Sequence, residues 1–133
     1  MPARSFIGSV LFSLAFAAAG GLAASDPAQA QDYPSQPVKL VVPYPPGGPV
    51  DAIARRFADQ MARQTNHPFV VDNRAGGGGS IGAATVAGAK PDGHTLLLTI
   101  PDALINVVTL IRNLPYDPRK DFAFVSQMRT RRR

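Results

Sequence analysis

Positions 38–49 read VKLVVPYPPGGP, and this stretch decides the fold. The segment from Val38 to Val42 is a short apolar run that contains one lysine, Lys39, and such a run is typical of a buried strand. Prolines and glycines follow that cannot continue a strand, and Pro49 suits the first turn of a helix. Apolar residues then recur at helical spacing, so the sequence predicts an amphipathic helix over about 50–64.

The alternation of strand and helix continues along the chain. The predicted elements are a strand at 69–71 that ends at 72–73, a glycine-rich loop at 76–79, a helix at about 80–89 and a strand at 94–100. Strands that alternate with helices and are apolar on both faces predict an α/β fold, with a parallel sheet and flanking helices. Beyond Pro101 the pattern is weaker and allows a helix over 102–112, a turn at 114–118 and a fourth strand over 122–125.

The first thirty residues have the pattern of a secretory signal peptide. Arg4 supplies a positive charge, Phe6 to Ala19 form an apolar run, and positions 28–30 give a small-x-small cleavage pattern. A membrane anchor is the alternative, but about 14 apolar residues are fewer than the roughly 20 that span a bilayer. We therefore expect cleavage after Ala30 and a mature chain that starts at Gln31, is exported to the periplasm and is not embedded in the membrane.

Composition excludes several classes of protein. The chain has no cysteine, so a small disulfide-stapled scaffold is excluded and stability must come from burial. The net charge is +5, but the last five residues, 129–133, contain four arginines without interleaved aromatic residues. Such a run is typical of a solvated tail, so no nucleic-acid partner is expected, although a small basic interaction protein remains an alternative.

The loop from Pro43 to Asp51 is the first candidate site. It lies at the carboxyl end of the first strand, where open α/β sheets bind ligands, and it opens a helix whose free N–H groups attract anions. Gly47 and Gly48 allow a ligand to approach the backbone closely, so a carboxylate is the expected ligand. The alternative is a proline-stiffened turn in which Asp51 only complements the helix dipole.

A second pattern concerns three glycines. Gly77, Gly79 and Gly82 spell G-x-G-x-x-G between a predicted strand and a helix, with Asp102 lying 20 residues beyond, as in a dinucleotide-binding fingerprint. However, four residues separate the strand from Gly77 instead of a tight turn, and another strand and helix precede it. A loop that simply permits close helix packing is favoured over a cofactor role.

No residue set indicates catalysis. His67 and His94 lie far apart beside turns, without a cysteine or glutamate to complete a metal site. No serine lies in a G-x-S-x-G motif, and no acidic pair has a spacing typical of hydrolases. We therefore expect neither enzymatic activity nor a metal or other cofactor.

Four ordered motifs carry a family resemblance. They are Tyr33 to Gly48 with Asp51; Val70 to Arg74 with Gly76 to Gly79 and Ile81 to Ala83; Pro91 to Leu98; and Leu114 to Pro118 running into Lys120 to Phe122. Over nearly all of 33–127 the chain resembles the extracytoplasmic solute-binding receptors of tripartite tricarboxylate transporters, also called Bug receptors. This resemblance implies a class II periplasmic-binding-protein fold, whose two α/β lobes close over a small organic acid, and membrane components of the transporter as partners.

The resemblance also implies a ligand site. The loop carried here by Pro46, Gly47, Gly48 and Asp51 would hold the ligand carboxylate through backbone N–H groups and ordered water, together with the loop after Thr99. In this picture the glycines supply donors, Asp51 orients a water or a polar ligand group, and Thr99 offers a hydroxyl.

Three features depart from the family pattern. Pro49 lacks a backbone N–H, and Asp102 would repel a carboxylate if it faced the cleft. Family members are also much longer, so we expect residues 31–128 to form an incomplete first lobe and 129–133 to be foreign to the fold. Such a truncated receptor should bind ligand weakly, because two lobes desolvate the ligand together.

Overall fold

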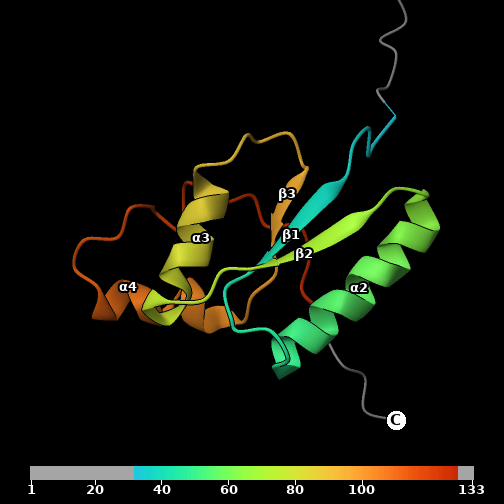
Figure 1. Ribbon diagram of the computed structural model, residues 1–133. Coiled ribbons are helices and arrows are strands. Elements are labelled where there is room, and N and C mark those ends of the chain that lie inside the picture. Colours follow the sequence, from blue (N-terminus) through green and yellow to red (C-terminus); the bar gives the residue numbers. More distant parts are fainter. Residues whose placement is uncertain (1–31, 129–133) are drawn as a thin grey trace, which may run out of the picture. The chain divides into compact units, whose positions relative to one another are not determined.

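Three parallel strands form the sheet, in the order β2-β1-β3. The computed structural model describes residues 32–128 and gives β1 (Val38–Val42), β2 (Phe69–Asn73) and β3 (Thr95–Leu97). β1 therefore lies in the centre and pairs with both other strands (Figure 1). All four of its valine and leucine side chains are buried, as a central strand covered on both faces requires.

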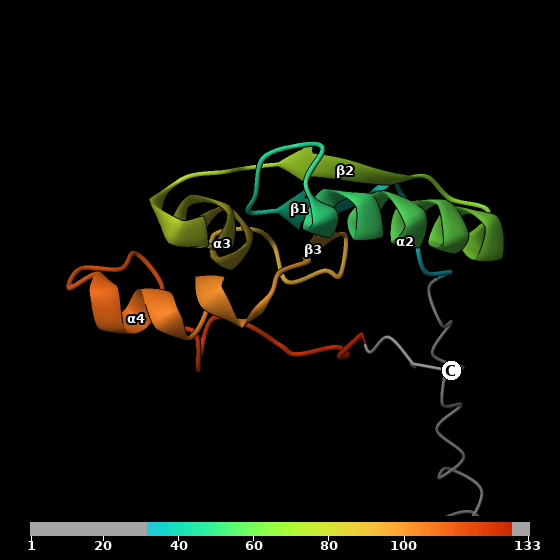
Figure 2. The same cartoon turned by 90° about the horizontal axis from the view of Figure 1, so that it is seen from below.

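Helices cover both faces of this sheet. The α-helices are α2 (Pro49–Thr65), α3 (Ser80–Ala87) and α4 (Asn106–Leu110), and the short 3₁₀ segments are η1 (Gly77–Gly79) and η2 (Pro101–Ala103). α2 contacts β1 and β2, whereas α3 contacts β1 and β3. The ribbon shows α2 on one side of the strands and α3 with α4 on the other (Figures 1 and 2).

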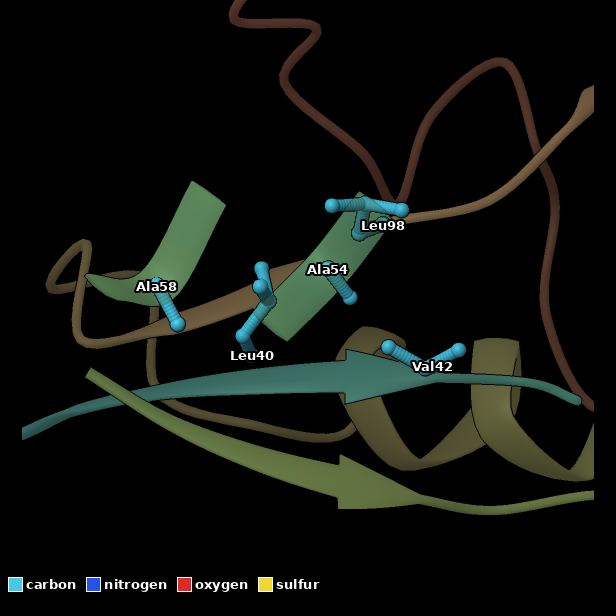
Figure 3. Close-up of a cluster of buried hydrophobic side chains, with 5 residues drawn as sticks. All are labelled: Leu40, Val42, Ala54, Ala58 and Leu98. Carbon is cyan, nitrogen blue, oxygen red and sulfur yellow. The ribbon is translucent and has the colours of Figure 1, made fainter. Parts of the chain in front are cut away.

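Side chains of the central strand form the first core with α2. Leu40 and Val42 point to the helix face that carries Ala54 and Ala58, and Leu98 closes the cluster (Figure 3). Ala54 is fully buried, and its small side chain lets the helix approach the sheet closely. The apolar stripe that predicted this helix is thus the face that packs on the strands.

A second cluster lies on the opposite face of the sheet. Ala83 of α3 and Val107 of α4 are buried together with Tyr116, and Phe122 packs edge-on against the Tyr116 ring with centroids 5.6 Å apart. The Tyr116 hydroxyl donates a hydrogen bond to the Ala103 carbonyl oxygen over 2.8 Å. This bond fastens the segment beyond α4 to η2.

Two glycines of the G-x-G-x-x-G pattern permit close packing around α3. A Cβ atom on Gly82 would lie 2.8 Å from the Pro43 Cβ and 3.0 Å from the Arg74 carbonyl oxygen. Gly79 has a φ of +96°, and a Cβ there would lie 2.6 Å from the Ala103 Cβ. Both positions exclude larger side chains for reasons of packing, which supports the interpretation of this segment as a packing loop.

The predicted elements agree with the structure except near the carboxyl end. The first strand has the predicted bounds, and α2 extends the predicted helix by one residue at each end. The third strand is shorter than the predicted 94–100, and the helix predicted over 102–112 is divided into η2 and α4.

The fourth strand predicted over 122–125 is wrong. No strand forms there within residues 32–128, and the side chains of Phe124 and Val125 are 77% and 83% exposed. This segment therefore gains neither the inter-strand hydrogen bonds nor the burial that would hold it in the sheet.

Two predicted segments cannot be compared with the structure. The signal peptide over 1–30, with its cleavage after Ala30, and the basic tail over 129–133 lie outside the described residues. Within the part that is described, no helix has both the length and the apolar character needed to cross a bilayer.

Candidate functional site

The candidate site lies at the carboxyl edge of the sheet, between β1 and β3. The chain leaves β1 toward α2 on one face, and it leaves β3 toward η2 and α4 on the other. In parallel sheets, such a reversal leaves a crevice outside the strand ends where ligands bind. The loop predicted from the sequence, Pro43 to Asp51, forms one wall of this edge.

The Asp51 carboxylate fixes this loop through hydrogen bonds. Asp51 is only 3% exposed, although it lies in the first turn of α2. Oδ2 accepts hydrogen bonds from the Gly47 backbone N–H and from Arg55 Nε, each over 2.9 Å, and Oδ1 accepts one from Asn73 Nδ2 over 2.9 Å. Both carboxylate oxygens are thus engaged by protein donors.

The same contacts stabilise the charged form of Asp51. Hydrogen bonds from Arg55, from the Gly47 backbone and from Asn73 lower the pKa of this carboxyl from 3.8 to about 2, against the opposing effect of burial. In return, the Asp51 carboxylate raises the pKa of Arg55. The carboxylate therefore stays ionised at any pH at which the protein would function, and the loop geometry does not depend on its titration.

Asn73 connects the end of β2 to the same loop. Besides Asp51, its Nδ2 donates to the Tyr44 carbonyl oxygen over 3.2 Å, and the Arg55 guanidinium donates to Asn73 Oδ1 over 3.4 Å. Two neighbouring strand ends are thereby joined through side chains. The loop is held by polar contacts in addition to its prolines.

Thr99 joins the loop that follows β3 to the loop that follows β1. Its Oγ1 donates to the Ile100 carbonyl oxygen over 2.9 Å and lies 3.2 Å from the Tyr44 hydroxyl. Because the single hydroxyl hydrogen of Thr99 is used, Tyr44 is the donor in the second contact. The Tyr44 hydroxyl oxygen therefore accepts no hydrogen bond within residues 32–128, and it can accept one from a ligand.

The first turn of α2 presents backbone donors. Gly48 is the N-cap in an extended conformation, with φ −81° and ψ 172°, and no side-chain cap hydrogen bond satisfies the helix start. The first N–H groups of a helix lack intrahelical partners, and Pro49 contributes none, so Gly48, Val50 and Asp51 carry the available backbone donors. Together with the positive end of the helix dipole they can hold an anion.

Two shallow hollows flank the Tyr44–Pro45 segment. One, of about 530 Å³, is lined by Tyr44 to Val50 and by Ile100. The other, of about 450 Å³, lies between Pro43 to Pro45, the glycine-rich loop, Asp102 and α4. The hollow lined by Tyr44 to Val50 contains most of the predicted loop, so it is the candidate binding surface.

The structure brings the predicted site residues together at one edge. Pro46, Gly47 and Gly48 line the first hollow, Asp51 lies beneath the loop, and Thr99 reaches the same loop through Tyr44. The Gly47 N–H donates to Asp51, whereas the Gly48 N–H makes no hydrogen bond within residues 32–128. The expected contact of Asp51 with water or ligand stays a prediction.

Sequence reasoning assigned no role to four residues of this edge. Tyr44, Asn73 and Arg55 form the polar network, and Ile100 lines the hollow. Asn73 sits directly at a predicted strand end, which was the available signal, whereas the contact of Arg55 with Asp51 follows from their i,i+4 spacing. In residues 32–128, no group of three or more metal-ligating side chains gathers.

Comparison with known protein families matches residues 53–132 to the tripartite tricarboxylate transporter family receptor. The chain belongs to this family. Similar solved structures are periplasmic binding proteins, so the fold of this receptor family accounts for the βαβ arrangement around the glycine-rich loop.

Individual relatives support this membership. The chain is similar to Protein BugT of Bordetella pertussis, with 40% identity over 85% of this chain and 34% of the relative. Among solved structures, it resembles MatC from Rhodopseudomonas palustris with bound malate, with 40% identity, a TM-score of 0.63, and coverage of 68% of this chain and 31% of that one. An R. palustris protein with adipate matches at 35% identity and a TM-score of 0.57, over 65% of this chain and 29% of that one. The chain thus spans about a third of the length of these tripartite-receptor relatives.

Proposed function

We propose that this chain supplies a carboxylate-binding edge of an extracytoplasmic receptor that captures small organic acids for a tripartite transporter. The observation that carries the proposal is the uncapped start of α2 at the β1/β3 edge, where Asp51 holds the glycine loop from below. Membership of the receptor family and the malate and adipate named for two similar structures agree with this assignment.

Each predicted residue has a place in this proposal. Gly48 donates its N–H to the ligand carboxylate, and Pro46 shapes the wall of the hollow. Gly47, with a φ of +83°, allows the turn and bonds Asp51, which positions the loop. Thr99 positions the Tyr44 hydroxyl at the rim. No metal or cofactor and no catalytic step enters the proposal.

The proposed compartment is the periplasm, reached with a signal peptide that is removed after Ala30. Membrane components of the tripartite system are the proposed protein partners. Because the ligand is enclosed by two lobes in such receptors, we expect this chain alone to bind with millimolar affinity, and calorimetry of the 31–133 segment at micromolar protein should detect little heat.

Nuclear magnetic resonance tests the proposal, because amide shifts report weak binding. The ¹⁵N-labelled full chain would be titrated with succinate, malate, adipate, hexanoate and benzoate, with the neutral diamide of succinic acid as a control. Saturable shifts at Gly48, Val50 and Thr99 with at least one acid, and none with the diamide, are expected. Shifts confined to the arginines of 129–133, or no saturable shift with any acid, would refute the proposed function.

A pair of variants isolates the Gly48 donor. Gly48 has a φ of −81°, which proline can adopt, and a Cβ there would lie 3.6 Å from the Pro45 carbonyl oxygen, an ordinary contact. Gly48→Pro removes the N–H and should weaken carboxylate binding about tenfold, whereas Gly48→Ala keeps the N–H and should bind as the parent does. Equal affinities of the two variants would exclude Gly48 as the donor.

A further inference from the structure

The hollow beside α2 offers mostly carbon surface to a ligand. Besides the two glycines, the residues that line it are aromatic, proline or aliphatic: Tyr44, Pro45, Pro46, Pro49, Val50 and Ile100. Ile100 is 43% exposed, so nearly half of an aliphatic side chain remains open to a bound molecule. Apart from the backbone of Gly47 and Gly48, the lining provides few groups that could replace water around a polar ligand atom.

A negative charge lies next to this hollow. Tyr44 and Pro45 line both hollows, and Asp102 lies in the wall of the second one. Asn106 Nδ2 donates to Asp102 Oδ1, but no ion pair in residues 32–128 neutralises the Asp102 carboxylate. A ligand anchored at Gly48 that extends across Tyr44 therefore approaches a like charge with its far end.

Resting on the proposed function, we infer that this edge selects carboxylates with a hydrocarbon body over dicarboxylates and hydroxy acids, and that Ile100 is a specificity-determining residue. The ligand's single carboxylate binds at the start of α2, and its hydrocarbon part lies on Ile100 and the prolines. Apolar contact with the hollow stabilises a bound hydrocarbon group, and the Asp102 carboxylate repels a second negative charge.

The net positive charge of the protein acts against a preference for ligands with a single carboxylate, so such a preference would identify the hollow as its source. The chain carries a net charge of +5, which attracts dianions more strongly than monoanions whatever the local surface of the site. A preference for monoanions would therefore arise from the local surface, against the general electrostatic attraction. The probes are hexanoate and benzoate on one side and succinate and malate on the other.

Amide-shift titrations of the full chain give the four dissociation constants. Hexanoate and benzoate are expected to bind at least about fivefold more tightly than succinate and malate. If all four acids shift Gly48 and Val50 with equal affinity, or the dicarboxylates bind more tightly, the inference on specificity fails while the proposed function stands. If none of them gives a saturable shift at these residues, both fail.

Substitutions at the two selecting positions complete the test. Ile100→Ser should weaken hexanoate binding about fivefold and leave malate unchanged, while Ile100→Val, which keeps an aliphatic surface, should stay near the parent. Asp102→Asn should strengthen succinate binding roughly twofold to fivefold without affecting hexanoate. Both side chains lie at the surface, and unchanged amide spectra elsewhere would verify folding. Unaltered dissociation constants in Ile100→Ser and Asp102→Asn would overturn the inference.

Discussion

The substitution Gly82→Ala tests the close packing of α3 against the loop after β1. The added Cβ would lie 2.8 Å from the Pro43 Cβ, 2.9 Å from the Pro43 Cα and 3.0 Å from the Arg74 carbonyl oxygen. These atoms belong to a ring and to backbone, so they cannot turn aside as the end of a flexible side chain can. Overpacking of this kind costs up to about 3 kcal/mol, whereas alanine in place of glycine inside a helix gains about 1 kcal/mol.

The expected result is a net loss of about 2 kcal/mol in the free energy of unfolding. Urea titration followed by circular dichroism should show the midpoint moving down by more than about 1 M. Gly88→Ala is the matched control, because Gly88 has a φ of −84° and its Cβ would meet only the Ala84 carbonyl oxygen at 3.5 Å. That variant should be as stable as the parent or up to about 1 kcal/mol more stable. A Gly82→Ala protein as stable as the Gly88→Ala protein would refute the packing argument.

Three further predictions concern the core and the loop. Leu40→Ala removes most of a side chain that is 2% exposed, and should cost about 3 kcal/mol in a urea titration; a cost below about 1 kcal/mol would contradict its place in the core. Tyr116→Phe leaves the Ala103 carbonyl without its 2.8 Å donor and should cost about 1 kcal/mol, with the loss detected as faster amide exchange around η2; unchanged exchange would count against the bond. The lowered pKa of Asp51 means that its contacts stabilise the protein fully above pH 3.8 and are lost as the pH falls toward about 2, so unfolding free energies measured across this range should decline. Asp51→Asn should flatten part of that decline, and an identical pH profile in the variant would disprove the linkage.

The sequence was most informative where local pattern and burial agree. The run Val38 to Val42 is apolar except for the exposed Lys39 because it is the central strand, and prolines and glycines end it abruptly. Beyond residue 100 the local pattern misled, since apolar residues such as Phe124 and Val125 remain exposed. Whether an apolar segment joins a sheet depends on a neighbouring strand, and local sequence does not encode the presence of that neighbour.

The candidate site was predictable in place but only partly in detail. The glycine loop could be located because strand, loop and helix follow one another in the chain. The contacts of Asp51 with Asn73 and of Tyr44 with Thr99 join segments that end or follow different strands, so they depend on the β2-β1-β3 order. Spacing along the chain could not show that Gly47 donates to Asp51, although this contact changes which N–H can serve a ligand.

The position of β1 in the sheet also determines when the protein can fold. Among the strands of residues 32–128, the central one leaves the ribosome first, and its second partner, β3, is complete only at Leu97. Until then, one hydrogen-bonding edge of a largely apolar strand has no neighbour, and closing the contact between Val41 and Leu97 requires a long loop. The nascent chain is therefore open to misassociation until β3 has emerged, and a factor that holds unfolded chains would raise its yield.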